Sequence, residues 1–73
     1  MTGNWEVYKV LRNGIDRTVT FSRWVEKTSD STRVHDLELV TITENGELFG
    51  TELLRSSDVV KRINQLIDLG YVG

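Results

Sequence analysis

The sequence feature that most constrains the fold is an Asn13-Gly14 pair set between two runs of alternating side chains within residues 5–25. A two-residue type I′ turn needs positive φ at both central positions, and Asn and Gly tolerate positive φ best. The pattern therefore predicts a β-hairpin on which the rest of the chain packs. With the pair as the two loop residues, the predicted cross-strand partners are Arg12 with Ile15, Val10 with Arg17, Tyr8 with Val19, and Glu6 with Phe21.

The predicted hairpin has two unlike faces, because successive side chains of a strand point to opposite sides. One face collects β-branched and aromatic side chains that favour burial, so we expect it to be the core face. It holds Tyr8, Val10, Ile15, Val19, Phe21 and Val25. The other face holds Trp5, Val7, Lys9 and Leu11 against Asp16, Thr18, Thr20, Ser22 and Trp24. There Trp5 lies diagonal to Trp24, within reach of aromatic contact.

A second hairpin is predicted around Asn45-Gly46, between apolar runs at residues 34–43 and 48–54. The polar stretch 27–33, with no apolar residue, is typical of a mobile loop between the second and third strands. Gly50 indicates a bulge or a close backbone approach in the fourth strand. The predicted pairs are Thr43 with Leu48, Ile42 with Phe49, and Val40 with Thr51, which leaves Leu37, Leu39 and Leu48 on the opposite face.

After Arg55 the apolar period changes from two to 3.6, which predicts an amphipathic helix at the end of the chain. Ser56 or Ser57 is its expected N-cap, and Gly70 its expected C′ residue. We expect an ion pair between Asp58 and Arg62, four residues apart. The predicted buried stripe is Val59, Val60, Ile63, Leu66 and Ile67. The fold class is thus α+β: one domain, residues 1–73, in which a four-stranded antiparallel sheet of two Asn-Gly hairpins is followed by one C-terminal helix packed on one face.

Composition narrows the function classes further. The chain has 73 residues, a net charge of −2 and no cysteine, so disulfides, thiolate chemistry and cysteine-based metal sites are excluded. We expect a cytoplasmic protein, because neither a signal peptide nor an apolar run of membrane-spanning length is visible. A core this small favours oligomerisation. The first 25 residues are basic and residues 26–52 acidic, which is most simply explained by charges that pair across strands.

The sequence offers no convincing catalytic or metal-binding group. His35 is the only histidine, and it does not converge with Asp36 and Glu38, its neighbours on one predicted strand. The glycine-bearing segment 46–51 lacks the Lys-Ser/Thr ending of a phosphate loop. Glu44, Glu47 and Glu52 flank a surface turn, where carboxylate pKa values have no reason to be perturbed. We therefore predict no enzyme, no metal and no cofactor.

Two functions remain, and both use the sheet. Exposed aromatics beside Lys or Arg can stack single-stranded bases, which makes Trp5, Lys9 and Trp24 a possible nucleic-acid platform. Tryptophans at strand ends also cover a sheet face or enter a dimer interface, and the acidic chain favours this reading. The leading prediction is a small protein–protein interaction module that forms a homodimer or binds a protein partner, without a membrane; the alternative is single-stranded nucleic-acid binding. The candidate interaction residues are Trp5, Lys9, Arg17, Arg23, Trp24, Leu37 and Leu39.

Overall fold

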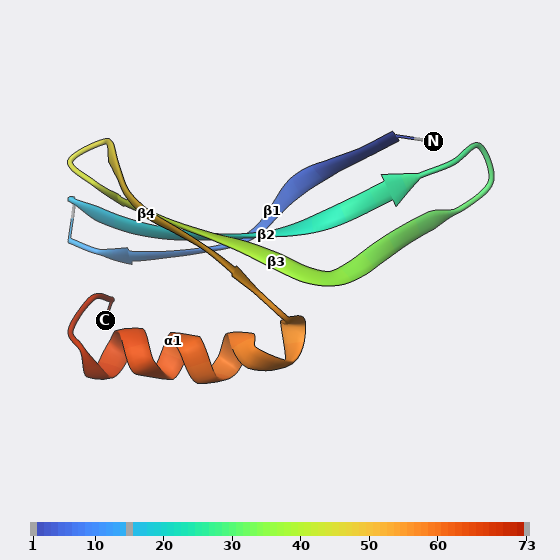
Figure 1. Ribbon diagram of the computed structural model, residues 1–73. Coiled ribbons are helices and arrows are strands. Elements are labelled where there is room, and N and C mark those ends of the chain that lie inside the picture. The colour runs from blue at the N-terminus through green and yellow to red at the C-terminus, as the bar shows by residue number, and fades with distance from the viewer. Residues whose placement is uncertain (1, 15, 73) are drawn as a thin grey trace.

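The computed structural model describes residues 2–14 and 16–72 and has the predicted α+β architecture. The elements are β1 (Thr2–Asn13), β2 (Arg17–Lys27), β3 (Thr32–Glu44), β4 (Glu47–Leu54), a 3₁₀ turn (Ser56–Asp58) and α1 (Val59–Asp68). The four strands form one antiparallel sheet in the order β1-β2-β3-β4, and α1 lies along one face of it (Figure 1). The predicted fold class is confirmed.

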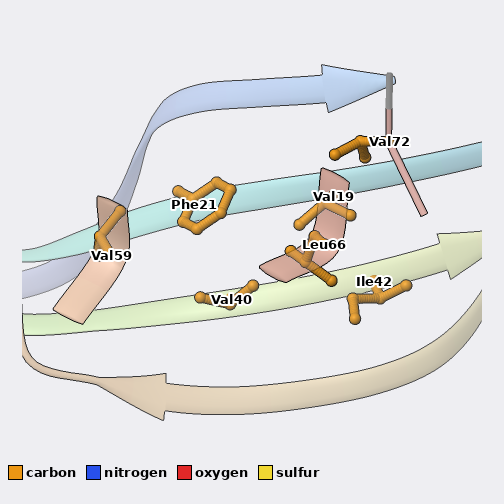
Figure 2. Packing of buried hydrophobic residues seen from close by; sticks show 7 residues of the cluster. All are labelled: Val19, Phe21, Val40, Ile42, Val59, Leu66 and Val72. Carbon is orange, nitrogen blue, oxygen red and sulfur yellow. The ribbon is translucent and has the colours of Figure 1, made fainter. Parts of the chain in front are cut away.

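The core lies between α1 and the two central strands. Both β2 and β3 have a strand on each side, so their side chains are shielded laterally as well as from below by the helix (Figure 2). Val19, Phe21 and Val40 are fully buried there. The buried cluster consists of Val19, Phe21, Val40, Ile42, Val59, Leu66 and Val72.

The first hairpin has a different register from the predicted one. Asn13 pairs with Arg17, so the loop holds three residues rather than two, and Val19 faces Leu11 rather than Tyr8. The predicted pairs of Val10 with Arg17, Tyr8 with Val19 and Glu6 with Phe21 are therefore wrong. Arg12 pairs with Thr18, and its predicted partner Ile15 lies outside the described residues.

Contacts made by the loop explain this register. The side-chain amide of Asn13 donates to the Gly70 carbonyl at 2.9 Å, and the Asn45 backbone N–H donates to the Asp16 carbonyl at 2.7 Å. The first loop is thereby tied to the second hairpin and to the chain end. An Asn-Gly pair alone does not distinguish between these loop lengths, so tertiary contacts decide the outcome.

A β-bulge at Tyr8 then shifts β1 by one residue. Val7 pairs with Ser22 and Lys9 with Phe21, which leaves Tyr8 as the extra residue. The predicted core face is consequently only half right. Val19, Phe21 and Val25 are buried, whereas Tyr8 and Val10 are exposed.

The second hairpin keeps its predicted turn. Asn45 and Gly46 have φ values of 53° and 79°, as a type I′ turn requires, and Thr43 pairs with Leu48. Beyond that pair, Phe49 is the extra residue of a bulge beside Gly50, which bears out the irregularity that the glycine indicated. The predicted pairs of Ile42 with Phe49 and Val40 with Thr51 are wrong. Ile42 faces Gly50 and Val40 faces Glu52.

The structure contradicts the predicted N-cap of helix α1 and confirms its predicted C-terminal glycine. Neither expected serine caps it with its side chain; instead the Ser56 backbone N–H donates to the Asp36 carboxylate of β3 at 3.2 Å. At the other end, Gly70 has φ +76° and donates to the Ile67 carbonyl, while Tyr71 donates to the Leu66 carbonyl. This is a Schellman motif, so the predicted C′ glycine is confirmed.

The buried side of the helix is narrower than predicted. Val59 and Leu66 are buried and Ile63 packs against the core, but Val60 and Ile67 are 69% and 49% exposed. Arg62 pairs with Glu52 of β4 at 2.6 Å, not with Asp58. This ion pair links the helix to β4 beside the buried contacts of Val59 and Leu66.

Part of the sheet extends beyond the helix. The β2–β3 connection is a short turn at residues 28–31, held by the Thr28 N–H to Ser31 carbonyl hydrogen bond of 2.9 Å, so the strands are longer than the predicted loop allowed. Strand β4 ends at Leu54, opposite Glu38, and leaves the first half of β3 without this neighbour. The molecule is therefore elongated, with extents of 42 × 25 × 15 Å (Figure 1).

Two adjacent helix positions test the core. Leu66→Ala should lower the free energy of unfolding by about 2–5 kcal/mol, because it removes a side chain only 1% exposed. Ile67→Ala, on the exposed side, should change it by less than about 0.5 kcal/mol. Urea unfolding monitored by circular dichroism measures both. Equal losses in the two variants would contradict the observed rotation of α1.

Candidate functional site

The candidate site is the side of the sheet away from α1, which we call the open face. Alternation along each strand sends the side chains next to the core residues to this side. The strand pairings arrange them in rows across the sheet. The rows are Arg12, Thr18, Thr43 and Leu48; Val10, Thr20, Thr41 and Thr51; Val7, Ser22, Leu39 and Leu53; and Trp5 with Trp24.

An aromatic pair forms one end of the open face. Trp5 and Trp24 are directly opposite each other rather than diagonal as predicted, and their rings meet edge to face with centroids 5.2 Å apart. The ring of Trp24 lies over β1 at Gly3, so closely that a Cβ atom there would be 2.6 Å from the ring. The absence of a side chain at this position is what allows the indole to approach the neighbouring strand so closely.

The middle of the open face combines exposed apolar side chains with threonines. Val7, Val10 and Leu53 are 59%, 43% and 61% exposed, and no element of the described chain covers them. Leu39, one of the candidate residues, lies in the same row as Val7 and is half-buried. Exposed apolar side chains gathered on one face in this way are typical of an interaction site.

The predicted cations are on the other side of the sheet. Lys9 faces Phe21 and is separated from the tryptophans by the bulge at Tyr8. Arg17 pairs with Glu44 at 2.7 Å and stacks on Tyr71 at 4.4 Å, where it holds the end of the chain. The structure therefore does not assemble the predicted group of Trp5, Lys9 and Trp24. Within the four rows, Arg12 is the one charged side chain.

Leu37 stands apart from the other candidates. It lies in an irregular stretch where β3 places residues 35–37 against Trp24 alone. Its side chain is 40% exposed. The same stretch brings His35 Nε2 to 2.7 Å from Glu26 Oε1.

A polar cluster that the sequence did not indicate lies on the helix side of the sheet, with one residue from each of β1, β2 and β3. Glu38 is only 1% exposed and accepts a hydrogen bond from the Tyr8 hydroxyl. The Arg23 guanidinium, a candidate interaction group, sits 3.9 Å from the centre of the Tyr8 ring. Burial, then the hydrogen bond to Glu38 and its charge, raise the pKa of Tyr8, against a smaller opposing effect of Arg23. The bulge brings Tyr8 to this side, and no sequence signal announced it.

Residues 2–14 and 16–72 contain no metal site, pocket or membrane-spanning helix. No group of His, Asp and Glu side chains there could hold a metal ion, and no pocket opens on that surface. No helix of the described chain is long and apolar enough to span a membrane.

Comparisons with known proteins add no relative: no protein-family model, curated protein or solved structure matches the chain.

The contact between Gly3 and Trp24 can be tested with two glycines. Gly3→Ala should displace the Trp24 ring and weaken the near-ultraviolet circular dichroism of the tryptophan pair, because its Cβ would overlap the indole. Gly50→Ala is the matched control, since a Cβ there meets nothing within 4 Å. An unchanged spectrum for Gly3→Ala would contradict the placement of Trp24.

The Tyr8–Glu38 hydrogen bond predicts a pH dependence of stability. At neutral pH Tyr8→Phe should lower the free energy of unfolding by about 1–3 kcal/mol, because the buried carboxylate loses its donor. The folded-state pKa of Tyr8 lies above its ordinary value of 10.0, so the stabilisation is full below that pH and is lost as the pH rises through the raised value.

Urea unfolding of both chains between about pH 8 and about pH 11 measures this difference. The gap between wild type and Tyr8→Phe should narrow at the alkaline end. Tyr71 is present in both chains and serves as an internal control. A gap that widens with pH would contradict the assignment.

Proposed function

We propose that this chain is a small protein-binding module whose open face is the binding surface. The observation that carries the proposal is the uncovered apolar area formed by Val7, Val10, Leu39 and Leu53 beside the Trp5–Trp24 pair. Burying such side chains against another protein is favourable at about 25 cal/mol per Å² of apolar surface. Aromatic side chains at the edge of the area are typical anchors of protein interfaces.

Single-stranded nucleic acid is the second candidate, and the arrangement of charge argues against it. A stacking platform needs cations beside its aromatics to neutralise phosphates. Here Lys9, Arg17 and Arg23 lie on the helix side, and Arg12 is some distance along the open face from the tryptophans. Arg33 lies one row beyond the tryptophans, directly opposite the acidic Glu26. A net charge of −2 adds to the argument.

The proposal includes a cytoplasmic location and a role without catalysis. A chain without cysteine suits a reducing compartment. The open face, on which no pocket opens in the described residues, suits a macromolecular partner better than a small substrate.

Paired variants with equal chemistry test the proposal. Leu39→Arg places a charge in the open face, whereas Val60→Arg places the same charge on the exposed side of α1. Each immobilised chain is exposed to cell lysate, and retained proteins are identified by mass spectrometry. We expect a specific partner, or the chain itself, to be retained by wild type and Val60→Arg and lost with Leu39→Arg.

Oligonucleotide binding is measured on the same chains by tryptophan fluorescence. At about 0.15 M salt we expect no quenching by single-stranded DNA. Micromolar binding that weakens steeply with salt and requires Trp24 would replace protein binding with the nucleic-acid alternative.

A further inference from the structure

We infer that the partner bound at the open face is a second copy of this chain, stacked face to face about a two-fold axis that runs across the strands. This rests on the proposed function and names its partner. Four observations support a second copy: the shape of the monomer, the size of the open face, the protection of the sheet edges, and the position of Arg12 on the open face.

The monomer is more extended than a compact protein of the same mass. Its radius of gyration is 13.6 Å, against about 11 Å for a compact chain of this length. Its accessible surface of 5114 Å² exceeds the roughly 4,600 Å² typical of a monomer of this mass. Because cysteine is absent, disulfides cannot compensate for the small core. Association is the remaining means of covering the sheet.

The open face has the area that a small dimer needs. Four strands are about 19 Å wide, and the rows from the tryptophans to Arg12 span about 23 Å. The footprint is then at most about 440 Å² per copy, because the tryptophan row spans only two strands. The accessible area of a studded surface is larger than its footprint, so two copies approach the roughly 1,000 Å² that is the lower limit for a specific interface. Two sheets stacked in this way pack about 10 Å apart.

The edges of the sheet are protected against the competing mode of assembly, in which strands pair side by side. Both outer strands carry a bulge, at Tyr8 in β1 and at Phe49 in β4, and β1 also carries Lys9. Bulges and edge lysines discourage pairing with another strand. Association is therefore directed to the face.

The position of Arg12 on the open face selects the orientation, because the other charges on this side, Glu26 and Arg33, lie directly opposite each other beyond the tryptophans. Arg12 is at one end and the Trp5–Trp24 pair at the other. An axis parallel to the strands would bring the two Arg12 side chains to the same end of the interface. An axis across the strands places each Arg12 over the tryptophan pair of the other copy, where a cation–π contact is available. Between the two ends of this interface, threonine hydroxyls of the two copies can donate hydrogen bonds to one another and accept them.

Sedimentation with matched arginine variants tests the second copy. We expect wild type to form a dimer with a dissociation constant in the micromolar range, and Leu53→Arg to weaken it by about tenfold or more, because the charge enters the interface twice. Val60→Arg, equally exposed but on α1, should dimerise as wild type does. Both positions are more than half exposed, so circular dichroism should report unchanged folding.

Single cysteines test the geometry, because the chain has none of its own. A short bis-maleimide should cross-link Thr41→Cys, near the proposed axis, into a covalent dimer. Thr18→Cys, in the row of Arg12, should not cross-link, since an axis across the strands holds its two copies far apart. Asn64→Cys on the exposed side of α1 is the negative control.

The outcomes separate this inference from the proposed function. A wild-type chain that stays monomeric at high concentration overturns the second copy, while partner loss with Leu39→Arg would still uphold protein binding. Dimers weakened by Val60→Arg and not by Leu53→Arg overturn the open face as the contact. Efficient cross-linking of Thr18→Cys overturns the orientation.

Discussion

The helix is much shorter than the strands on which it packs, and the rest of the structure depends on this difference in length. Ten helical residues span about 15 Å, whereas strands of 11–13 residues span roughly 35–45 Å. The helix therefore covers Val19, Phe21, Val40 and Ile42, and the remainder of the sheet must be stabilised in other ways. The far part of its helix side is filled by the Tyr8–Glu38–Arg23 cluster, and the far part of its open face by the tryptophan pair.

The bulge at Tyr8 contributes both to the polar cluster on the helix side and to the apolar surface on the open face. It places Tyr8 and Lys9 on the helix side in succession, so that the residues before it alternate in the opposite sense from those after it. Trp5 and Val7 consequently share the open face with Val10 and Arg12. One additional residue in β1 thus supplies the donor for a buried carboxylate and completes an apolar surface on the reverse of the sheet.

Much of the fold could be predicted because it rests on local signals. The turn at Asn45-Gly46, the C′ glycine at Gly70 and the change of period after Arg55 depend on backbone preferences of a few neighbouring residues. The pairing of β1 with β2 depends instead on where Asn13 and Asp16 find distant partners, at Gly70 and Asn45. Such contacts leave no periodic trace in the sequence, so the first hairpin was predicted with the wrong register and Lys9 with the wrong face.

The candidate site likewise had one part that the sequence could predict and another that it could not. Contact between Trp5 and Trp24 was predictable, because both stay on one face in either register, and its outcome is confirmed. The position of Lys9 beside them was not, since an odd shift in register moves a whole run of side chains to the other face.

The composition of the open face also bears on how tightly it can bind. Threonines occupy five positions in the two rows of the open face that contain Arg12 and Val10: Thr18, Thr20, Thr41, Thr43 and Thr51. Their β-branched side chains favour the strand conformation, while their hydroxyls remain hydrated when the face is free. Leucine or valine at all these positions would raise the apolar area and with it the risk of indiscriminate aggregation. A threonine centre bordered by Trp24, Val10 and Leu53 instead allows reversible association, because the energy of contact comes from the border and the centre must only match its partner in shape and hydrogen bonding.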